Sequence, residues 1–337
     1  MASIVLKRLA TAIPSLIGVI FVSFLLTRVL PGDTASYFAG PAATPQAIAE
    51  VRKQLGLDKS LPEQFARYVA DLAHGDLGNS LTTGRPVVAE IANRLPASGE
   101  LTLLGLLIAL TIAVPLGILA AIREGLWIDH VCRVIVTTGV SLPVFFTGLL
   151  LVYVFYFQLG WSPAPLGRLD VFYSAPPQVT GFYVVDSLIA RDFETFRAAF
   201  AQLILPAATL AIFSLAPLAR ITRGSMLAVM GSDFVRTARA SGLTPKTVIL
   251  TYAFRNAMLP VVTTLGMVFS FLLGANVLVE KVFAWPGIGS YAVEALLASD
   301  YAPVQGFVLA MAVLYVALNL MIDLLYGVID PRVRLEA

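Results

Sequence analysis

The sequence is poor in cysteine, in histidine and in charged residues. Its 337 residues include one cysteine and two histidines, and only 13% are charged. A lone Cys132 cannot form a disulfide within the chain, and His74 and His130 add too few ligands for a metal site of the usual types. An enzyme with a nucleophile or metal cluster inside a membrane is therefore disfavoured.

Two further absences limit how the chain can use energy. It has no GxxxxGK[ST] phosphate loop, so we do not expect it to bind ATP by that route. Charge is also scarce within its apolar runs, where only Asp323, four residues after Asn319, lies near an interior. An ion-coupled carrier needs ionisable groups at depth, and no inverted repeat is evident. A secondary transporter is therefore the weaker alternative.

Apolar residues are abundant, at 58% of the chain. Six uncharged runs are long enough to cross a hydrocarbon core as helices. They are Leu9–Thr27, Leu101–Ile122, Val134–Leu159, Ala198–Ala219, Asn256–Val279 and Tyr301–Ile322. No ten-residue alternation indicates a barrel, and irregular backbone cannot face lipid. The expected fold class is an all-α integral membrane protein with six transmembrane helices.

Charge distribution predicts the orientation of these spans. Lys7 and Arg8 precede the first run, which lacks a following cleavage site and reads as a retained anchor. If the N-terminus is inside, the inner segments carry 12 Lys+Arg against 6 Asp+Glu, and the outer ones 11 against 15. Basic residues favour the cytoplasmic side. Both termini are therefore expected in the cytoplasm.

The outer segment 31–99 contains the helix-start residues expected of a small helical domain. Thr44 with Pro45, Ser60 and Pro86 each mark the start of a short amphipathic helix. Such a domain either meets a soluble partner or simply packs on the bundle. The expected division is 1–30 (first transmembrane helix), 31–99 (extracytoplasmic domain), 100–330 (transmembrane core) and 331–337 (cytoplasmic tail).

A basic stretch, FVRTARASGLTPKTVILTYAFRNAMLP, lies between two apolar runs. Gly231 and Ser232 end one helix and begin another, in which Phe234, Val235 and Ala238 make a small apolar face. Gly242 is a natural stop, after which Thr244 and Pro245 start a second helix. The residues alone leave open a lipid-bound interfacial hairpin.

The same stretch resembles the EAA-type loop of ATP-binding-cassette (ABC) importer permeases, here at 231–256. Four further segments add to the resemblance and occur in the right order. They are KRLATAIPSLIGVIFVSFLLTRVLPGD, LGLDKSLPEQFARYVADLAHGDLGNSLTTGRPV, VFAWPGIGSYAVEALLASDYAPVQG and NLMIDLLYGVIDPRVR. Together they are similar to the first permease of the dipeptide, oligopeptide, nickel and glutathione subfamily. Arg236 replaces the acidic residue of the general pattern, and the spacing Gly242 to Pro260 is longer than in sugar permeases. Both departures are usual in the peptide subfamily.

The resemblance implies a type I ABC importer permease fold in the bacterial inner membrane. The implied partners are a homologous second permease, two cytoplasmic ATPase subunits that use ATP and Mg, and an extracytoplasmic substrate-binding protein. No cofactor in this chain, no nucleic acid and no catalytic role are implied. The implied coupling residues are Asp233, Phe234, Val235, Arg236, Thr237, Ala238, Arg239, Ala240, Ser241 and Gly242.

The solute is the least determined feature. Di- and oligopeptides fit the overall pattern best, with nickel complexes and glutathione as alternatives. Helix breakers such as Pro143 and Pro260 either kink the spans or line a path. Candidate path residues are Ser141, Phe145, Thr263 and Asn276, and ordinary packing is the default interpretation of each.

Overall fold

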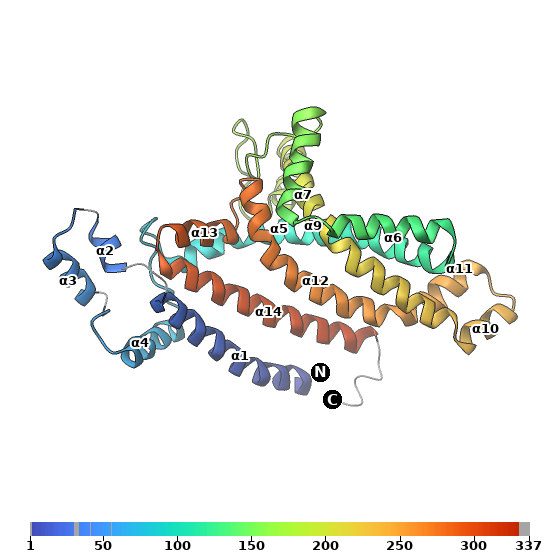
Figure 1. Ribbon diagram of the computed structural model, residues 1–337, viewed down its shortest axis with the longest axis horizontal. Helices are drawn as coiled ribbons and strands as arrows, with labels where there is room; N and C mark the ends of the chain where they lie inside the picture. Colours follow the sequence, from blue (N-terminus) through green and yellow to red (C-terminus); the bar gives the residue numbers. More distant parts are fainter. Residues whose placement is uncertain (1, 30–33, 41, 55, 330–337) are drawn as a thin grey trace. The chain divides into compact units, whose positions relative to one another are not determined.

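The computed structural model describes residues 2–29, 34–40, 42–54 and 56–329. This part of the chain is helical, with one isolated bridge between Asn79 and Pro86. The first helices are α1 (Ala2–Val29), α2 (Thr34–Ala39), α3 (Pro45–Gln54), α4 (Leu61–Ala73), α5 (Val87–Ile122), α6 (Trp127–Val140), α7 (Val144–Leu151), the π-helix η1 (Val152–Gln158) and α8 (Tyr183–Ile189). They are followed by α9 (Phe193–Met230), α10 (Asp233–Ala240), α11 (Pro245–Thr247), the π-helix η2 (Val248–Phe254), α12 (Arg255–Val282), α13 (Ile288–Leu297) and α14 (Tyr301–Ile329) (Figure 1). The expected tail at 331–337 lies outside the described residues.

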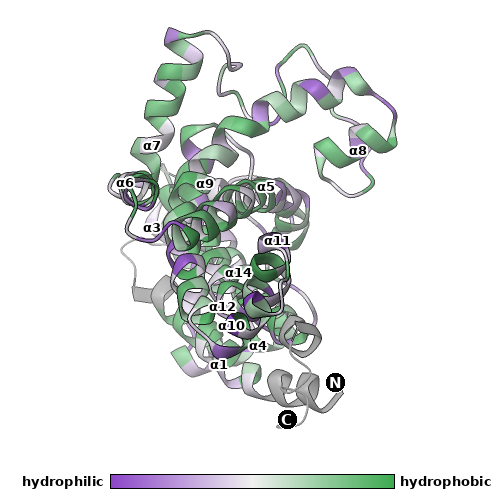
Figure 2. Cartoon of the chain, turned by 90° about the vertical axis from the view of Figure 1, so that its right-hand side faces the viewer, coloured by the Kyte–Doolittle hydropathy of each residue, from purple (hydrophilic) through white to green (hydrophobic). Residues whose placement is uncertain are grey.

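Several helices are long and apolar enough to cross a membrane. Within the described residues these are Val87–Ile122, Phe193–Met230, Pro245–Val282 and Tyr301–Leu324. A bent pair, Trp127–Gly139 with Val144–Gln158, makes a fifth if it counts as one span, and α1 contains the shorter apolar segment Thr11–Leu25. Hydrophobic colour predominates along α7 in Figure 2. The chain is a multi-pass membrane protein.

The third apolar run is not the continuous span expected from Val134–Leu159. Helix α6 ends at Val140, Ser141 caps it, and a bend of 99° separates it from the helix that begins at Val144. Pro143 lies at the break, with extended backbone, and a proline disfavours the helical conformation of the residue before it. Hydropathy reports the length of an apolar run and not its straightness, whereas Pro143 was the signal in the sequence that the span could bend here.

The second run also differs in extent. The short helix expected from Pro86 and the span expected from Leu101 form one helix, α5, which begins at Val87. Pro96 lies inside this helix without ending it. A proline removes one backbone donor but need not stop a helix whose neighbours are well packed.

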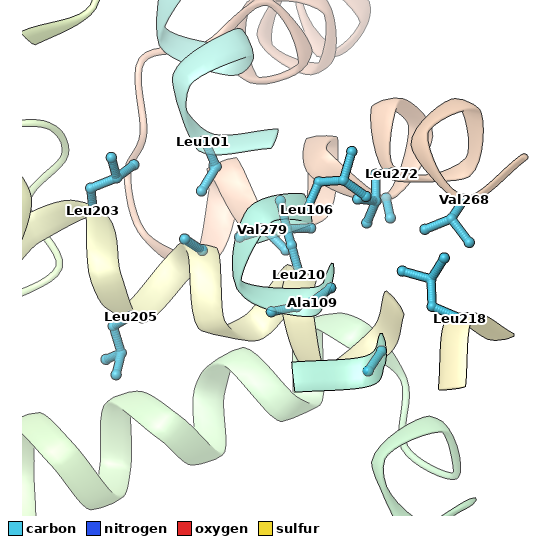
Figure 3. Close-up of a cluster of buried hydrophobic side chains, with 14 of the residues drawn as sticks. Leu101, Leu106, Ala109, Leu203, Leu205, Leu210, Leu218, Val268, Leu272 and Val279 are labelled. Carbon is cyan, nitrogen blue, oxygen red and sulfur yellow. The ribbon is translucent and has the colours of Figure 1, made fainter. Parts of the chain in front are cut away.

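The chain divides into two compact units, residues 1–96 with 286–317 and residues 97–285 with 318–337. The core of the second unit lies between α5, α9 and α12. Figure 3 shows Leu106, Leu210 and Val279, one from each helix, pointing toward one another. Small residues bring the helices close: a Cβ on Gly117 would lie 2.6 Å from the Cβ of Thr222.

The first unit contains the helices that the outer segment predicted. Helix α3 begins at Pro45 after Thr44, whose hydroxyl accepts from the N–H of Ala47 at 3.3 Å. Helix α4 begins after Ser60 in a capping box with Glu63. Phe65 of α4 then packs edge-on against Phe21 and Phe24 of α1, with ring centroids 5.6 and 5.2 Å apart. These predicted helix starts are confirmed.

A buried carboxylate anchors the turn between α4 and α5. Asp300, which is fully buried, accepts hydrogen bonds from the Ser80 hydroxyl at 2.7 Å and from both the N–H and the hydroxyl of Thr82 at 3.1 Å. Tyr291 of α13 lies near this carboxylate and packs with Val87 of α5 in a buried cluster of the same unit. The turn is therefore held to the α13–α14 junction by charge-assisted hydrogen bonds.

Candidate functional site

The candidate site is the short basic helix α10 and the turn that follows it. Helix α9 ends at Met230 and Gly231, and α10 begins at Asp233 after Ser232 in extended conformation. The Ser232 hydroxyl does not cap α10; it donates back to the carbonyl of Val229 at 2.5 Å. Asp233 in the first turn complements the helix dipole. The predicted break and restart are confirmed, although Ser232 begins α10 without a hydroxyl cap.

Helix α10 is divided into an inner and an outer face. Val235 is fully buried and Ala238 is 5% exposed, and both pack against Val248 of η2 and Val229 of α9. Phe234, which the sequence placed on the same apolar face, is 45% exposed. Two of the three residues of the predicted apolar face, Val235 and Ala238, therefore fix α10 to its own chain.

The outer face is basic and carries one aromatic ring. Its exposed residues are Asp233, Phe234, Arg236, Thr237, Arg239 and Ala240, continuing into Ser241 and Gly242. Arg236 forms an ion pair with Asp233 at 2.7 Å, but both side chains are largely exposed, so the pair contributes little to stability. Aromatic and arginine side chains are enriched at the centres of protein interfaces. This face is suited to bind another protein.

The turn after α10 fixes its angle to the next helix. Gly242 has φ +76°, a left-handed conformation that favours glycine, and its N–H donates to the carbonyl of Arg239 at 3.0 Å. Thr244 then accepts from the N–H of Thr247 at 3.3 Å, and Pro245 occupies the first helical position. From there η2 leads directly into α12. The glycine elbow predicted from the sequence is confirmed.

The four candidate path residues do not share one environment. Ser141 is exposed at the end of α6 and donates to the carbonyl of Thr137 at 2.9 Å, and Phe145 on α7 is 42% exposed. Thr263 is exposed on α12, whereas Asn276 on the same helix is 3% exposed. The structure therefore sets Asn276 apart from the other three.

Asn276 belongs to a buried polar network that includes a carboxylate. Its amide Nδ2 lies 3.1 Å from Glu280 Oε1, 3.3 Å from the Ser98 carbonyl and 3.2 Å from Thr102 Oγ1. Glu280 is fully buried and also accepts from the Ser98 hydroxyl at 2.5 Å. The expectation that Asp323 is the one charge near a span interior is therefore wrong. Glu280 follows the last residue of an uncharged run, so counting runs missed it; its i,i+4 spacing from Asn276 was the available signal.

A buried ion pair organises the long segment between η1 and α9. Arg168 Nη2 lies 2.5 Å from Glu100 Oε2, and its guanidinium stacks 3.5 Å from the ring centroid of Tyr183. Asp186 accepts hydrogen bonds from the Thr180 hydroxyl and from the backbone N–H groups of residues 179, 180 and 181. This segment is an ordered part of the second unit.

The described residues contain no group of three or more His, Cys, Asp and Glu side chains placed to hold a metal ion.

Comparison with known proteins identifies the relatives of this chain. Residues 1–102 match the N-terminal model of binding-protein-dependent transport system membrane components, and residues 113–335 match the model of their inner membrane component.

Named relatives are similar over nearly their whole length. The chain is 45% identical over 316 residues to the probable D,D-dipeptide transport system permease protein DdpB of Escherichia coli (strain K12), covering 94% of this chain and 93% of the relative. It is 42% identical over 335 residues to the di/tripeptide transport system permease protein DppB of Pseudomonas aeruginosa (strain UCBPP-PA14), covering 99% of each. The chain therefore belongs to the family of binding-protein-dependent transport system inner membrane components.

Proposed function

We propose that this chain is the permease subunit of an ABC importer that moves di- or oligopeptides from an extracytoplasmic binding protein into the cytoplasm. The observation that carries the proposal is near-full-length similarity to relatives named as dipeptide and di/tripeptide permeases. The family supports transport over catalysis. Nickel complexes and glutathione are the alternative solutes.

The proposed topology has six spans in a bacterial inner membrane with both termini in the cytoplasm. The spans are α1, the part of α5 from residue 100 onward, the α6–α7–η1 segment, α9, α12 and α14, and residues 31–99 lie outside. Exposed apolar side chains along α1, such as Ile13, Ile17 and Phe21, support contact with lipid. The basic outer face of α10 supports a cytoplasmic position.

The proposed partners are a second homologous permease, two cytoplasmic ATPase subunits that use ATP and Mg, and the binding protein. Helix α10 with its elbow, Asp233 to Gly242, docks on an ATPase subunit through its outer face. The contact residues are Phe234, Arg236 and Arg239, because Val235 and Ala238 are already occupied within the chain. Closure of the ATPase dimer on ATP draws the two coupling helices together and opens the outer gate. This chain performs no hydrolysis itself.

The solute path is proposed between the two permease subunits. Ser141, Phe145 and Thr263, all exposed in the single chain, are the residues proposed to contact the solute. Asn276, which is buried, is proposed not to contact the solute but to hold Glu280 in position through its hydrogen bond. The break at Ser141 supports this placement, because irregular backbone at membrane depth is tolerated where it lines a cavity.

The outer domain is proposed to engage the loaded binding protein. The first unit contains a pocket of about 910 Å³ between α4, the following turn and the start of α14. Its charged lining has three exposed carboxylates (Glu63, Asp71 and Asp76) and the buried Asp300, against two basic side chains (Lys59 and Arg67). A basic projection of the binding protein is the complementary partner.

Copurification tests the proposal directly. The tagged chain is extracted from its host in mild detergent, and whatever accompanies it is identified and counted. We expect a second permease and two ATPase subunits. The ATPase subunits should detach from the variant Phe234→Ala/Arg236→Glu but stay with the control variant Arg220→Lys, an exposed position on α9. Dipeptides should compete for uptake.

The buried Glu280 is what a secondary carrier would require, so that rival needs its own test. A chain that purifies alone and supports uptake unaffected by ATP depletion would establish the rival and reject the importer.

A further inference from the structure

We propose that the ion pair between Asp129 and Arg223 is a positioning element for energy coupling. It fixes the start of α6 to α9 two turns before α9 gives way to α10. The inference rests on the proposed role of α10 as the coupling helix. In this proposal, the ion pair makes α6 move together with α10.

The pair has the geometry of a fixed joint. Asp129 Oδ1 accepts from Arg223 Nε and Oδ2 from Arg223 Nη2, each at 2.8 Å, and the backbone N–H of Gly125 donates to Oδ2 at 3.2 Å. Asp129 is 1% exposed and the Arg223 side chain 24%. A bidentate guanidinium fixes both the distance and the relative angle of two helices, which a single contact does not. Arg133 Nε, 3.6 Å from the same carboxylate, is 52% exposed and adds one weaker contact.

The neighbours of Arg223 on α9 also hold this helix to others, through close packing. Thr222 is fully buried against Gly117 of α5, where no Cβ fits. Met226, also fully buried, packs with Ala121 of α5 and with Ala253 and Ala257 of the segment after α10. The end of α9 is therefore held to α5, to α6 and to the start of α12 within two turns.

This joint is continuous with α10. Val229, one turn beyond Met226, packs with Val235 and Ala238 of α10 and with Val248 of η2. Packed side chains and rigid helices carry displacement between distant sites. A force applied to the outer face of α10 therefore reaches Arg223 through packed residues and reaches α6 through Asp129. The far end of α6 is Ser141, at the break proposed to line the path.

The prediction is a loss of coupling without a loss of assembly. In the complete complex reconstituted in vesicles, Arg223→Lys keeps the charge but cannot form the bidentate contact, and Asp129→Asn keeps the shape but removes the charge. We expect solute transported per ATP hydrolysed to fall at least about fivefold in each, the lower end of typical coupling between sites. Arg220→Lys, an exposed position on the same helix, is the matched control and should keep the wild-type ratio.

A double variant and a crosslink separate positioning from general stability. Exchange of the charges in Asp129→Arg/Arg223→Asp should restore part of the ratio. Asp129→Cys/Arg223→Cys, made in Cys132→Ser, should recover the ratio when joined by a short bifunctional thiol reagent and lose it when the link is absent. Assembled, crosslinked complex that still hydrolyses ATP without transport would contradict the proposal.

Two other outcomes also overturn it. Single variants that assemble and keep the wild-type ratio show that the pair has no role in coupling. A fall in assembled complex that matches the fall in transport, with an unchanged ratio, shows that the pair is structural only. A separate test shows whether the proposed role of α10 itself is wrong. In that case the variant Phe234→Ala/Arg236→Glu, with the Asp129–Arg223 pair intact, would leave ATPase binding and coupling unchanged.

Discussion

Replacing Gly242 with proline is expected to abolish energy coupling while the chain still inserts in the membrane. Gly242 has φ +76°, whereas proline fixes φ near −65°, a change of about 140° at the elbow between α10 and η2. Proline also removes the N–H that donates to the Arg239 carbonyl, which costs about 1 kcal/mol. The altered angle would point the outer face of α10 away from its partner.

A graded series separates conformation from bulk at this position. No atom lies within 4 Å of a Cβ built on Gly242, so alanine meets no clash and only the left-handed backbone penalty of roughly 1–2 kcal/mol remains. Gly242→Ala should therefore assemble and retain part of its activity, whereas Gly242→Pro should have none. Gly224→Ala, in helix α9 with equally open space and no positive φ, is the control and should behave as wild type.

The assay is uptake into vesicles with ATP hydrolysis by the partner subunits measured in the same preparation. Membrane insertion is checked by the amount of full-length chain in the membrane fraction. Normal uptake by a fully inserted Gly242→Pro chain would refute the reasoning, because the elbow would then have no mechanical role.

Three further predictions concern stability. Gly117→Leu should lower the melting temperature of the purified chain and loosen α5 from α9, since overpacking against Thr222 costs about 1–3 kcal/mol; an unchanged melting temperature would contradict the close packing. Glu280→Ala should destabilise by roughly 1–3 kcal/mol because the buried Ser98 hydroxyl loses its acceptor, with Glu280→Gln as the milder control; equal melting temperatures for both variants would argue against the network. Burial acts to raise the pKa of Asp186, but hydrogen bonds from the Thr180 hydroxyl and the surrounding backbone lower this pKa overall. The ionised Asp186 therefore stabilises the folded state above the unfolded pKa of about 3.9, and this stabilisation is lost as pH falls through the folded pKa. Limited proteolysis of the segment around residues 160–192 should therefore increase at low pH in the wild type, and Asp186→Asn should be cleaved more readily at neutral pH; identical cleavage of the two at neutral pH would contradict this account.

Local punctuation in the sequence predicted helix starts and stops well. Thr44 with Pro45, Ser60, Gly231 and Gly242 each occupy the position that their backbone chemistry demands. These signals are local: a cap, a fixed φ or a left-handed turn depends on a few neighbouring residues. The loop that carries the candidate site was therefore found from its own residues.

Features that depend on tertiary packing were not predicted. An apolar residue such as Phe234 belongs by periodicity to the face of Val235, but the structure buries one and exposes the other. Glu280 reads as the polar end of a span, although Ser98, 182 residues away in sequence, buries it. Pro143 indicated that the span could bend before Val144, but the sequence did not give the angle of 99°. In each case the deciding partner is distant in sequence or the deciding property is geometry.

The division of α10 into two faces has a consequence for how such a loop can change over time. Val235 and Ala238 hold the helix to its own chain, while Phe234, Arg236 and Arg239 take no part in that anchorage. Under the proposed coupling role, substitutions on the outer face should alter which ATPase is recognised without unfolding the loop. Substitutions on the inner face should alter how α10 packs on its own chain without altering recognition. If α10 has the proposed role, the choice of ATPase and the efficiency of coupling can change independently within these eight residues.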